Sequence, residues 1–278
     1  MKKNTFLSSL LLVFLAFGST KNVIKDSLEI PIEIESEVEI NGKNEVDKQK
    51  INNSLRFHQN LKKQDHQNHQ LWDELLQKYV SESGKVNYVG FKKDKAKLEG
   101  YIKTLKEKRP QYQWTKQEIL AYWINAYNAL TIDLIIQNYP TKSIKDIKNP
   151  WGKSLWEFGD EWISLSQIEH KILREMDEPR IHFAIVCASV SCPKLQNKAF
   201  RPEILEMQLT AVTKEFLEDS NRNEISENEI KISKIFKWFA KDFNKNGNLI
   251  DFLNQYLGIK ISQQAKVSFK DYDWGLND

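Results

Sequence analysis

Residues 115–130 read TKQEILAYWINAYNAL, a pattern that predicts a long buried helix. Thr115 and Glu118 have the spacing of a capping box, in which each side chain satisfies a backbone N–H of the first turn. Apolar residues then occur on every side of the helix, which we expect to continue towards Asn138, before Pro140. Because a helix that is apolar all round is buried, the rest of the fold should pack around this one.

Asn125 and Asn128 are the polar exceptions on this helix, and their spacing of three residues places them on one face. A buried amide without hydrogen-bond partners costs about 1–3 kcal/mol, so both side chains need partners. One interpretation is structural, with the amides holding neighbouring loop backbone. The other is functional: Asn125 orients a catalytic side chain, and Asn128 lines a cleft and binds a ligand.

Other segments with helical spacing lie on both sides of this helix. Apolar residues recur at i, i+3 and i+4 in five further stretches, which we predict to be helices: 71–79, 98–105, 166–176, 202–216 and 248–257. Ser166 and Glu169 have the spacing of a second capping box.

Extended segments are fewer and shorter. A hairpin is predicted over 225–232, and a buried strand over 181–188, where only His182 interrupts an apolar run. Because no βαβ repeat is visible, we predict an α+β fold, with several buried helices packed on a small, mostly antiparallel sheet in a single domain. A papain-like arrangement is an analogy compatible with this order of elements.

The segment RIHFAIVCASVSCPK, residues 180–194, carries most of the reactive side chains. On a strand, His182 points to the face opposite Cys187, whereas Cys192 lies on the loop that follows. A sheltered imidazole and a thiol on an adjacent loop can form a thiolate–imidazolium pair. We therefore predict Cys192 as the nucleophile and His182 as its base, with Asn125 or Asn128 orienting the imidazole or stabilising an oxyanion.

Other interpretations of these residues stay open. His182 can equally be a core histidine with satisfied hydrogen bonds, and Cys187 a core thiol. In an oxidising compartment, Cys187 and Cys192 can instead be bridged by a disulfide. A metal site of His182 with both cysteines lacks the paired-cysteine spacing of a zinc ribbon. We assign no metal and no cofactor.

The beginning of the chain predicts export. Two lysines precede an apolar run over 6–17, which is followed by two small residues, and this is the pattern of a secretory signal peptide. We expect a protein that is periplasmic or secreted after cleavage. The predicted organisation has three parts: a signal peptide over 1–19, an acidic and polar tail and linker, mostly disordered, over 20–67, and a globular domain over 68–278.

Charge and hydropathy limit the classes of partner. The chain has 41 basic and 38 acidic residues; without Lys2 and Lys3, 39 basic residues remain and the net charge is +1. A near-neutral chain has no global electrostatic reason to bind nucleic acid. We find no segment after the signal peptide that is apolar for long enough to cross a membrane. The predicted partner is a small molecule or a peptide, and the oligomeric state stays open.

Several separate motifs, in one order, are similar to those of a known family. They are YWINAYNAL at 122–130, IEHKILR at 168–174, RIHFA at 180–184, SCP at 191–193 and YDWGLN at 272–277. Together they resemble the domain-of-unknown-function family 547 (DUF547), of which the chain is identified as an exported bacterial member. The resemblance covers roughly residues 70–278, and the acidic tail lies outside it.

The resemblance implies a list of site residues rather than an activity, because no reaction or cofactor is established for the family. Besides the residues already named, it draws attention to Glu169, His170, Arg174 and Arg180. The residues that we expect to bind a ligand are Asn128, Glu169, His170, Arg180 and Ser191.

Three hypotheses of function follow. The first is an exported thiol hydrolase or acyltransferase with a Cys192, His182 and Asn125 site. The second is a non-enzymatic exported binding module, in which Asn125, Asn128 and Arg180 hold a polar or anionic ligand. The third is a structural envelope protein whose polar core residues only specify the fold.

Overall fold

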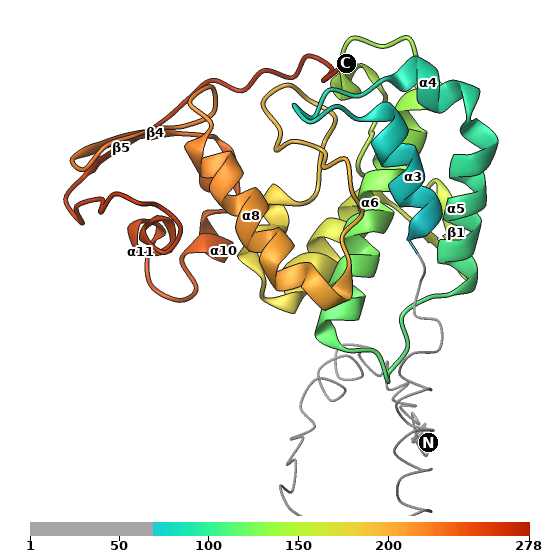
Figure 1. Ribbon diagram of the computed structural model, residues 1–278, viewed down its shortest axis with the longest axis horizontal. Coiled ribbons are helices and arrows are strands. Elements are labelled where there is room, and N and C mark those ends of the chain that lie inside the picture. Colours follow the sequence, from blue (N-terminus) through green and yellow to red (C-terminus); the bar gives the residue numbers. More distant parts are fainter. Residues whose placement is uncertain (1–68) are drawn as a thin grey trace, which may run out of the picture. The chain divides into compact units, whose positions relative to one another are not determined.

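The computed structural model describes residues 69–278, which all belong to one compact unit, Gln59–Asp278. The signal peptide predicted over 1–19 and the acidic tail predicted over 20–67 lie outside the described residues. Figure 1 shows the long helix α6 (Lys116–Asn138) in the middle of the described chain, between helices α3 to α5 on one side and α8 on the other.

Helix α6 forms where the sequence predicts it. The Thr115 hydroxyl accepts a hydrogen bond from the Glu118 N–H, and the Glu118 carboxylate accepts one from the Thr115 N–H, so the capping box is confirmed. By length and composition α6 could cross a membrane, which corrects our expectation that no such segment exists; 89% of its apolar window is buried inside the fold. A core helix passes the same test.

Three helices precede α6 and pack through apolar stripes. They are α3 (Gln70–Tyr79), α4 (Tyr88–Lys93) and α5 (Lys95–Glu107). Trp72 of α3 stacks on Tyr101 of α5 with ring centroids 5.7 Å apart, and both side chains are fully buried. Helices α4 and α5 contact α6 directly. The interior is therefore continuous from α3 to α6.

Shorter helical elements follow α6. They are 3-10 turns at Ile144–Asp146, Arg174–Met176, Pro179–Phe183 and Pro202–Ile204, a π-helical turn at Ile168–Leu173, and helices α7 (Leu165–Gln167), α8 (Leu205–Glu218), α9 (Ile235–Trp238), α10 (Ala240–Phe243) and α11 (Leu249–Asn254). The capping box that we predicted at Ser166 and Glu169 is wrong. Ser164 and Gln167 form it, because their side chains pair with each other's backbone N–H groups.

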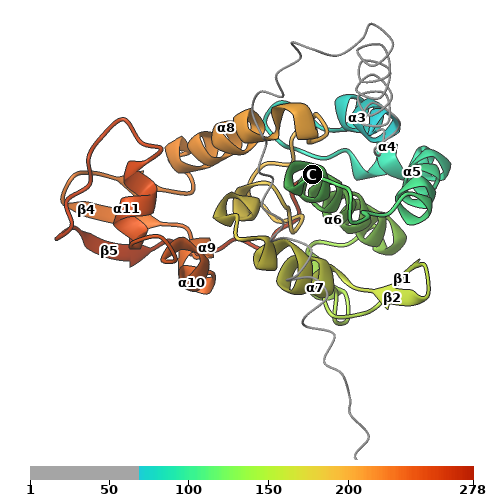
Figure 2. The same ribbon diagram turned by 90° about the horizontal axis from the view of Figure 1, so that it is seen from below.

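Two small sheets complete the α+β fold, and Figure 2 shows them at opposite ends of the described chain. Their strands are β1 (Trp156–Phe158) with β2 (Glu161–Ile163), and β3 (Glu224–Ile225) with β4 (Glu229–Ile232) and β5 (Lys266–Phe269). The β1–β2 and β3–β4 pairs are antiparallel, whereas β5 runs parallel to β4. The predicted hairpin is therefore confirmed.

Residues 181–188 do not form the strand that we predicted. A 3-10 turn covers Pro179–Phe183, and the chain then continues as a loop that makes one isolated bridge, between Ser189 and Leu276. Proline at the first position favours a helical start. A short apolar run that is buried on all sides is compatible with either a strand or a helix, so periodicity alone could not separate the two.

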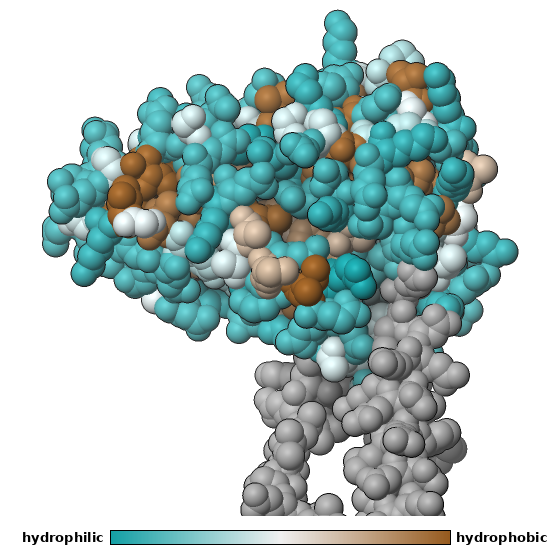
Figure 3. Space-filling view, viewed as in Figure 1, coloured by the Kyte–Doolittle hydropathy of each residue, from teal (hydrophilic) through white to brown (hydrophobic). Residues whose placement is uncertain are grey.

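The face seen in Figure 3 is mostly hydrophilic, with small and separate hydrophobic patches. Large apolar side chains exposed among the described residues are scattered along the sequence, from Tyr112 and Trp162 to Met207 and Trp238. Single exposed apolar residues of this kind are normal on a folded domain.

Candidate functional site

A cavity of about 290 Å³ lies beside the loop that carries both cysteines. Aromatic side chains are the largest group on its wall: Tyr127, Trp151, Trp238, Phe239, Tyr272 and Trp274. The titratable groups on the wall are Glu169, His170, His182, Cys187 and Cys192. An apolar cavity of this size with a few convergent polar groups is the usual form of a small-molecule site.

The two cysteines are free thiols in close contact. The Cys187 N–H donates a hydrogen bond to the Cys192 Sγ over 2.8 Å. The Cys187 Sγ lies 3.0 Å from the Ser189 hydroxyl and 3.3 Å from the Tyr272 hydroxyl. Cys187 is half-buried, whereas Cys192 is only 4% exposed. The strand geometry that would have turned Cys187 away from His182 is absent, and both residues line the cavity.

The surroundings shift the pKa values of the two thiols in opposite directions. A hydrogen bond from the Cys192 thiol lowers the pKa of Cys187, and the hydroxyls of Ser189 and Tyr272 add to this effect against the opposing influence of burial. Burial raises the pKa of Cys192, and the adjacent Cys187 sulfur raises it further. Cys187 is therefore the sulfur whose surroundings favour a thiolate, and Cys192 is its hydrogen-bond donor.

His182 belongs to a charged array on another part of the cavity wall. Its Nε2 lies 2.8 Å from an Asp242 carboxylate oxygen, and its ring stacks on Phe239 with centroids 3.9 Å apart. Arg174 donates two hydrogen bonds to the same carboxylate, over 2.6 and 2.9 Å. Asp242 is thus the residue that orients His182, the role that we had predicted for Asn125.

This array fixes the protonation states of its members. Burial alone would raise the pKa of Asp242, but hydrogen bonds from His182 and Arg174 outweigh it and hold that pKa well below its usual range. Burial lowers the pKa of His182, although Asp242 opposes the shift. At neutral pH the array is therefore an ionised carboxylate and a neutral imidazole, in which Nε2–H is held by the carboxylate and Nδ1 is the basic nitrogen.

Glu169 and His170 occupy the π-helical turn at the cavity. The Tyr127 hydroxyl donates to the Glu169 carboxylate over 3.2 Å, and the Arg174 guanidinium lies 3.1 Å from the His170 Nδ1. Burial raises the pKa of Glu169 to about 7, against the opposing hydrogen bond from Tyr127. Burial also lowers the pKa of His170. Glu169 can therefore exchange a proton near neutral pH.

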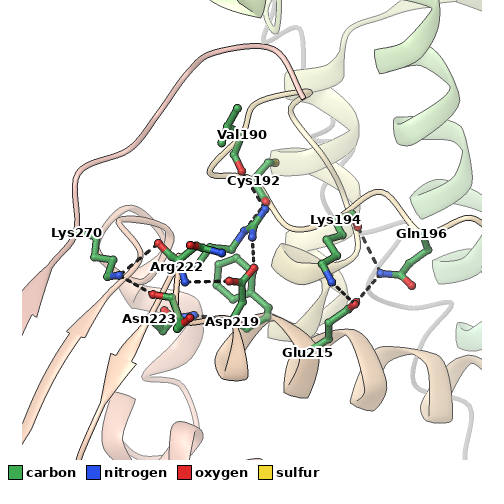
Figure 4. A network of polar contacts seen from close by, with 12 residues as sticks. Val190, Cys192, Lys194, Gln196, Glu215, Asp219, Arg222, Asn223 and Lys270 are labelled. Atoms are coloured by element: carbon green, nitrogen blue, oxygen red, sulfur yellow. Dashed lines mark hydrogen bonds and ion pairs between the residues drawn. The ribbon is translucent and has the colours of Figure 1, made fainter. Parts of the chain in front are cut away.

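The loop that carries the thiols is held from outside the cavity. Figure 4 shows Arg222 donating from Nε to the Cys192 carbonyl and from Nη2 to the Val190 carbonyl, each over 2.9 Å. Its remaining Nη1 pairs with the Asp219 carboxylate. Ala188 lies in the left-handed region with φ +59°, so this stretch of backbone is constrained at that point.

The C-terminal segment completes the support of this loop. The Val190 N–H donates to the Gly275 carbonyl over 2.8 Å, and the Ser191 N–H to the Asp273 carbonyl over 3.2 Å. The Ser191 hydroxyl in turn accepts from the Asp273 N–H over 2.8 Å. Ser191, which we predicted to bind a ligand, is therefore occupied by a backbone contact in this structure.

A wider depression of about 670 Å³ lies next to Arg222. Four of its charged residues form pairs, Lys194 with Glu215 over 2.8 Å and Arg222 with Asp219, and Gln196 also binds the Glu215 carboxylate over 2.9 Å, as Figure 4 shows. Because these surface pairs neutralise one another, the aromatic cavity remains the better candidate site.

The two asparagines of α6 lie away from the aromatic wall and bind backbone. Asn125 donates to the Phe200 carbonyl over 2.7 Å and accepts from the Phe200 N–H over 3.0 Å. Asn128 donates to the Ala184 carbonyl over 2.9 Å and accepts from the Val186 N–H over 3.0 Å. These contacts correspond to the structural interpretation of both residues.

Arg180, the third residue of the predicted anion site, is enclosed by acidic groups. Its guanidinium binds the Glu178 carboxylate over 2.6–2.7 Å and the Glu206 carboxylate over 2.5–2.8 Å. The structure thus brings Cys192, His182, Glu169 and His170 together at the cavity. It places the two asparagines, Arg180 and Ser191 elsewhere.

Sequence reasoning missed Asp242, Tyr127 and Tyr272, and gave Cys187 only the role of a core thiol. One signal could have identified Asp242, because it is the only acidic residue in the aromatic stretch 235–243. Among residues 69–278, no three His, Cys, Asp or Glu side chains are grouped as they would be to hold a metal ion.

Comparison with known proteins yields one match. Residues 111–217 match the model of a family described as protein of unknown function, DUF547. The comparisons with curated proteins and with solved structures found no match. The matched segment supplies Glu169, His182 and both cysteines, whereas Asp242 and the aromatic residues after 235 lie beyond it. The resemblance seen in the sequence is thereby confirmed over residues 111–217, which are similar to the DUF547 family.

Proposed function

We propose that the protein is a thiol-dependent acyl-transfer enzyme, a hydrolase or an acyltransferase, whose nucleophile is Cys187. One observation carries the proposal: the Cys187 sulfur lies at an aromatic cavity and is hydrogen-bonded by Ser189, Tyr272 and Cys192. The thiolate, not the thiol, is the attacking species, and hydrogen bonds to sulfur favour it. Cys192, the nucleophile that we predicted from the sequence, has surroundings that favour the protonated thiol.

The proposed reaction has two halves. The Cys187 thiolate attacks the carbonyl carbon of an ester, thioester or amide, and a carbon–sulfur bond forms. The bond to the leaving group then breaks, and Glu169 in its protonated form gives the leaving group a proton. Water or an acceptor hydroxyl next attacks the acyl-thiol, passing its proton back to Glu169, and the thiolate leaves. A carboxyl group with a pKa of about 7 suits both proton transfers.

The cavity wall defines the acyl group that this enzyme would accept. Six aromatic residues line the wall, and the volume of about 290 Å³ admits a group of small-molecule size. We therefore expect apolar or planar acyl groups to be preferred over charged ones. The neutral His182 imidazole, whose Nε2 is held by Asp242, adds a polar group to this wall.

The experiment is acylation with a nitrophenyl ester, followed by location of the adduct by peptide mass spectrometry. We expect an acyl adduct on Cys187 in the wild-type protein and in Cys192→Ser, and none on Cys187→Ser. Cys192→Ser is the matched control because it removes one thiol and keeps the other. An adduct on Cys192, or equal acylation of all three proteins, would contradict the assignment.

We also infer an exported location, which rests on the N-terminal pattern alone. The test is to express the full chain in a bacterium, fractionate the cells and determine the N-terminus of the accumulated protein. Recovery from the cytoplasm with residues 1–19 intact would contradict this inference.

A further inference from the structure

We propose that Cys187 and Cys192 also act as a dithiol–disulfide pair, which exchanges with small organic disulfides that enter the aromatic cavity. This exchange activity rests on the proposed function in one respect, because both use Cys187 as the nucleophile. It differs in requiring Cys192 as a second reacting sulfur.

The first argument is the contact between the two sulfur-bearing residues. The Cys192 Sγ lies 2.8 Å from the Cys187 backbone nitrogen, and the Cys192 thiol hydrogen-bonds the Cys187 sulfur. Four residues separate the cysteines, so a bond between their sulfurs closes a short loop that contains no helix or strand. The chain has two cysteines in all, and each is therefore the other's only partner within the chain.

The second argument is the unequal exposure of the two thiols. Cys187 is half-buried and can be reached from the cavity, whereas Cys192 is almost completely covered. In thiol–disulfide exchange, an accessible thiolate attacks first and a shielded thiol resolves the mixed disulfide. The pKa of Cys187 is lowered and that of Cys192 is raised, which supports the same order of attack.

The exchange balances as two substitutions at sulfur. The Cys187 thiolate attacks one sulfur of a substrate R–S–S–R′; the substrate S–S bond breaks, and R′–S⁻ leaves. Cys192 then loses its proton to solvent and attacks the Cys187 sulfur, so that R–S⁻ leaves and the Cys187–Cys192 bond forms. Two electrons pass from the dithiol to the substrate disulfide, which is the oxidant.

The cavity restricts the substrate to small disulfides. A volume of about 290 Å³ is that of a small-molecule site, so we expect small disulfides to react faster than disulfides within folded proteins. The aromatic wall, which includes Tyr272 and three tryptophans, offers favourable contacts to sulfur and to aromatic substituents.

The experiment uses dithiobis(nitrobenzoate), an aromatic disulfide whose released thiolate absorbs visible light. For the reduced wild-type protein we expect two equivalents of thiolate per chain and a final protein without adduct, lighter by two hydrogens. For Cys192→Ser we expect one equivalent and a stable adduct on Cys187. For Cys187→Ser we expect release to be slower by at least about tenfold.

Three results would overturn the inference. They are a wild-type protein that keeps an adduct on one or both cysteines, a Cys187→Ser variant that reacts as fast as wild type, and a Cys192→Ser variant that keeps no adduct. Thermal unfolding followed by circular dichroism checks that each variant is folded, and Cys192→Ala replaces Cys192→Ser where the serine variant is not.

The nitrophenyl ester assay separates this inference from the proposed function. If the wild-type protein is acylated on Cys187 in the ester assay but keeps the mixed disulfide in the dithiobis(nitrobenzoate) assay, the exchange activity alone is refuted. Formation of the Cys187–Cys192 disulfide without acylation would refute the acyl-transfer function alone.

Discussion

The two sides of the segment 181–193 differ in how their polar groups are satisfied. On the side that faces α6, the Asn128 side chain binds the backbone carbonyl of Ala184 and the backbone N–H of Val186. The Asn125 side chain binds the backbone of Phe200 in the same way. Towards the cavity, Cys187 and Glu169 are surrounded by side chains and carry shifted pKa values. Buried groups that are fully paired with backbone hold a scaffold, whereas titratable groups gathered at a cavity can react.

The largest expected effect comes from breaking the scaffold side. Asn128→Ala should lower the free energy of unfolding by about 2–5 kcal/mol, because it leaves the Ala184 carbonyl and the Val186 N–H buried without partners. Urea denaturation measures the change. The matched control is Asn138→Ala on the exposed end of the same helix, which should cost less than about 1 kcal/mol. Equal losses in the two variants would contradict the distinction.

A smaller effect is expected on the reactive side, and it depends on pH. Burial raises the pKa of Glu169 from an ordinary value of 4.5 to about 7, so the folded state binds this proton more tightly than the unfolded state. The stability from this group is complete below pH 4.5 and is lost as the pH rises through 7. Glu169→Gln stays neutral throughout. The free energy of unfolding of Glu169→Gln minus that of the wild type should therefore be larger at pH 8 than at pH 4, by on the order of 2–3 kcal/mol.

Urea denaturation of the wild type and of Glu169→Gln across this pH range tests the prediction. Taking the difference between the two proteins removes the contribution of other titrating groups. A difference that stays constant from pH 4 to pH 8 would show that the carboxyl has an ordinary pKa.

The support of the thiol loop offers a third and weaker test. Arg222→Ala removes two hydrogen bonds from the backbone that carries Cys192, and the loosened thiol should support the Cys187 thiolate less well. We expect alkylation of Cys187 by iodoacetamide near neutral pH to slow by about fivefold to tenfold, with its pH midpoint moved upwards. Arg222→Lys should restore part of the rate.

The control for this test is Lys270→Ala. Lys270 binds the carbonyls of Ser220 and Asn221 beside Arg222, but not the thiol loop. An unchanged pH midpoint in Arg222→Ala, or the same shift in Lys270→Ala, would remove Arg222 as a positioning residue.

The smallest effect is expected at Thr131, a buried polar residue of α6 whose hydroxyl has no hydrogen-bond partner among the described residues. The Thr131 hydroxyl is the only buried side-chain nitrogen or oxygen without a hydrogen-bond partner within residues 69–278. Thr131→Val replaces it with a methyl group of similar size, so we expect a change within about 1 kcal/mol, towards higher stability. A clear loss of stability in urea denaturation would indicate that the hydroxyl does have a partner.

Much of the fold could be predicted from local patterns. The α6 helix follows from an apolar run behind a capping box, and the 225–232 hairpin from strand-like residues around a turn. The strand predicted at 181–188 was wrong because a short buried run has no periodicity that separates strand from helix. The second capping box was misplaced by two residues because Ser164/Gln167 and Ser166/Glu169 both fit the pattern.

The candidate site could be predicted only where its residues are close in sequence. Cys192 and His182 are on one motif, and the resemblance added Glu169. Asp242 lies 60 residues from His182, and Tyr272 lies 85 residues from Cys187. These contacts arise from tertiary packing, which no local spacing encodes, and the Tyr272 hydroxyl is one of the groups that lower the pKa of Cys187.

The separation of Tyr272 from Cys187 has a consequence for the timing of synthesis. The ribosome makes about 5–20 residues per second, so the 85 residues between them take roughly 4–17 seconds. During that interval the nascent chain lacks the Tyr272 hydroxyl and much of the aromatic wall. Until then the full set of contacts around the Cys187 sulfur is absent, and the proposed nucleophile is complete only when the C-terminal segment has packed against the thiol loop.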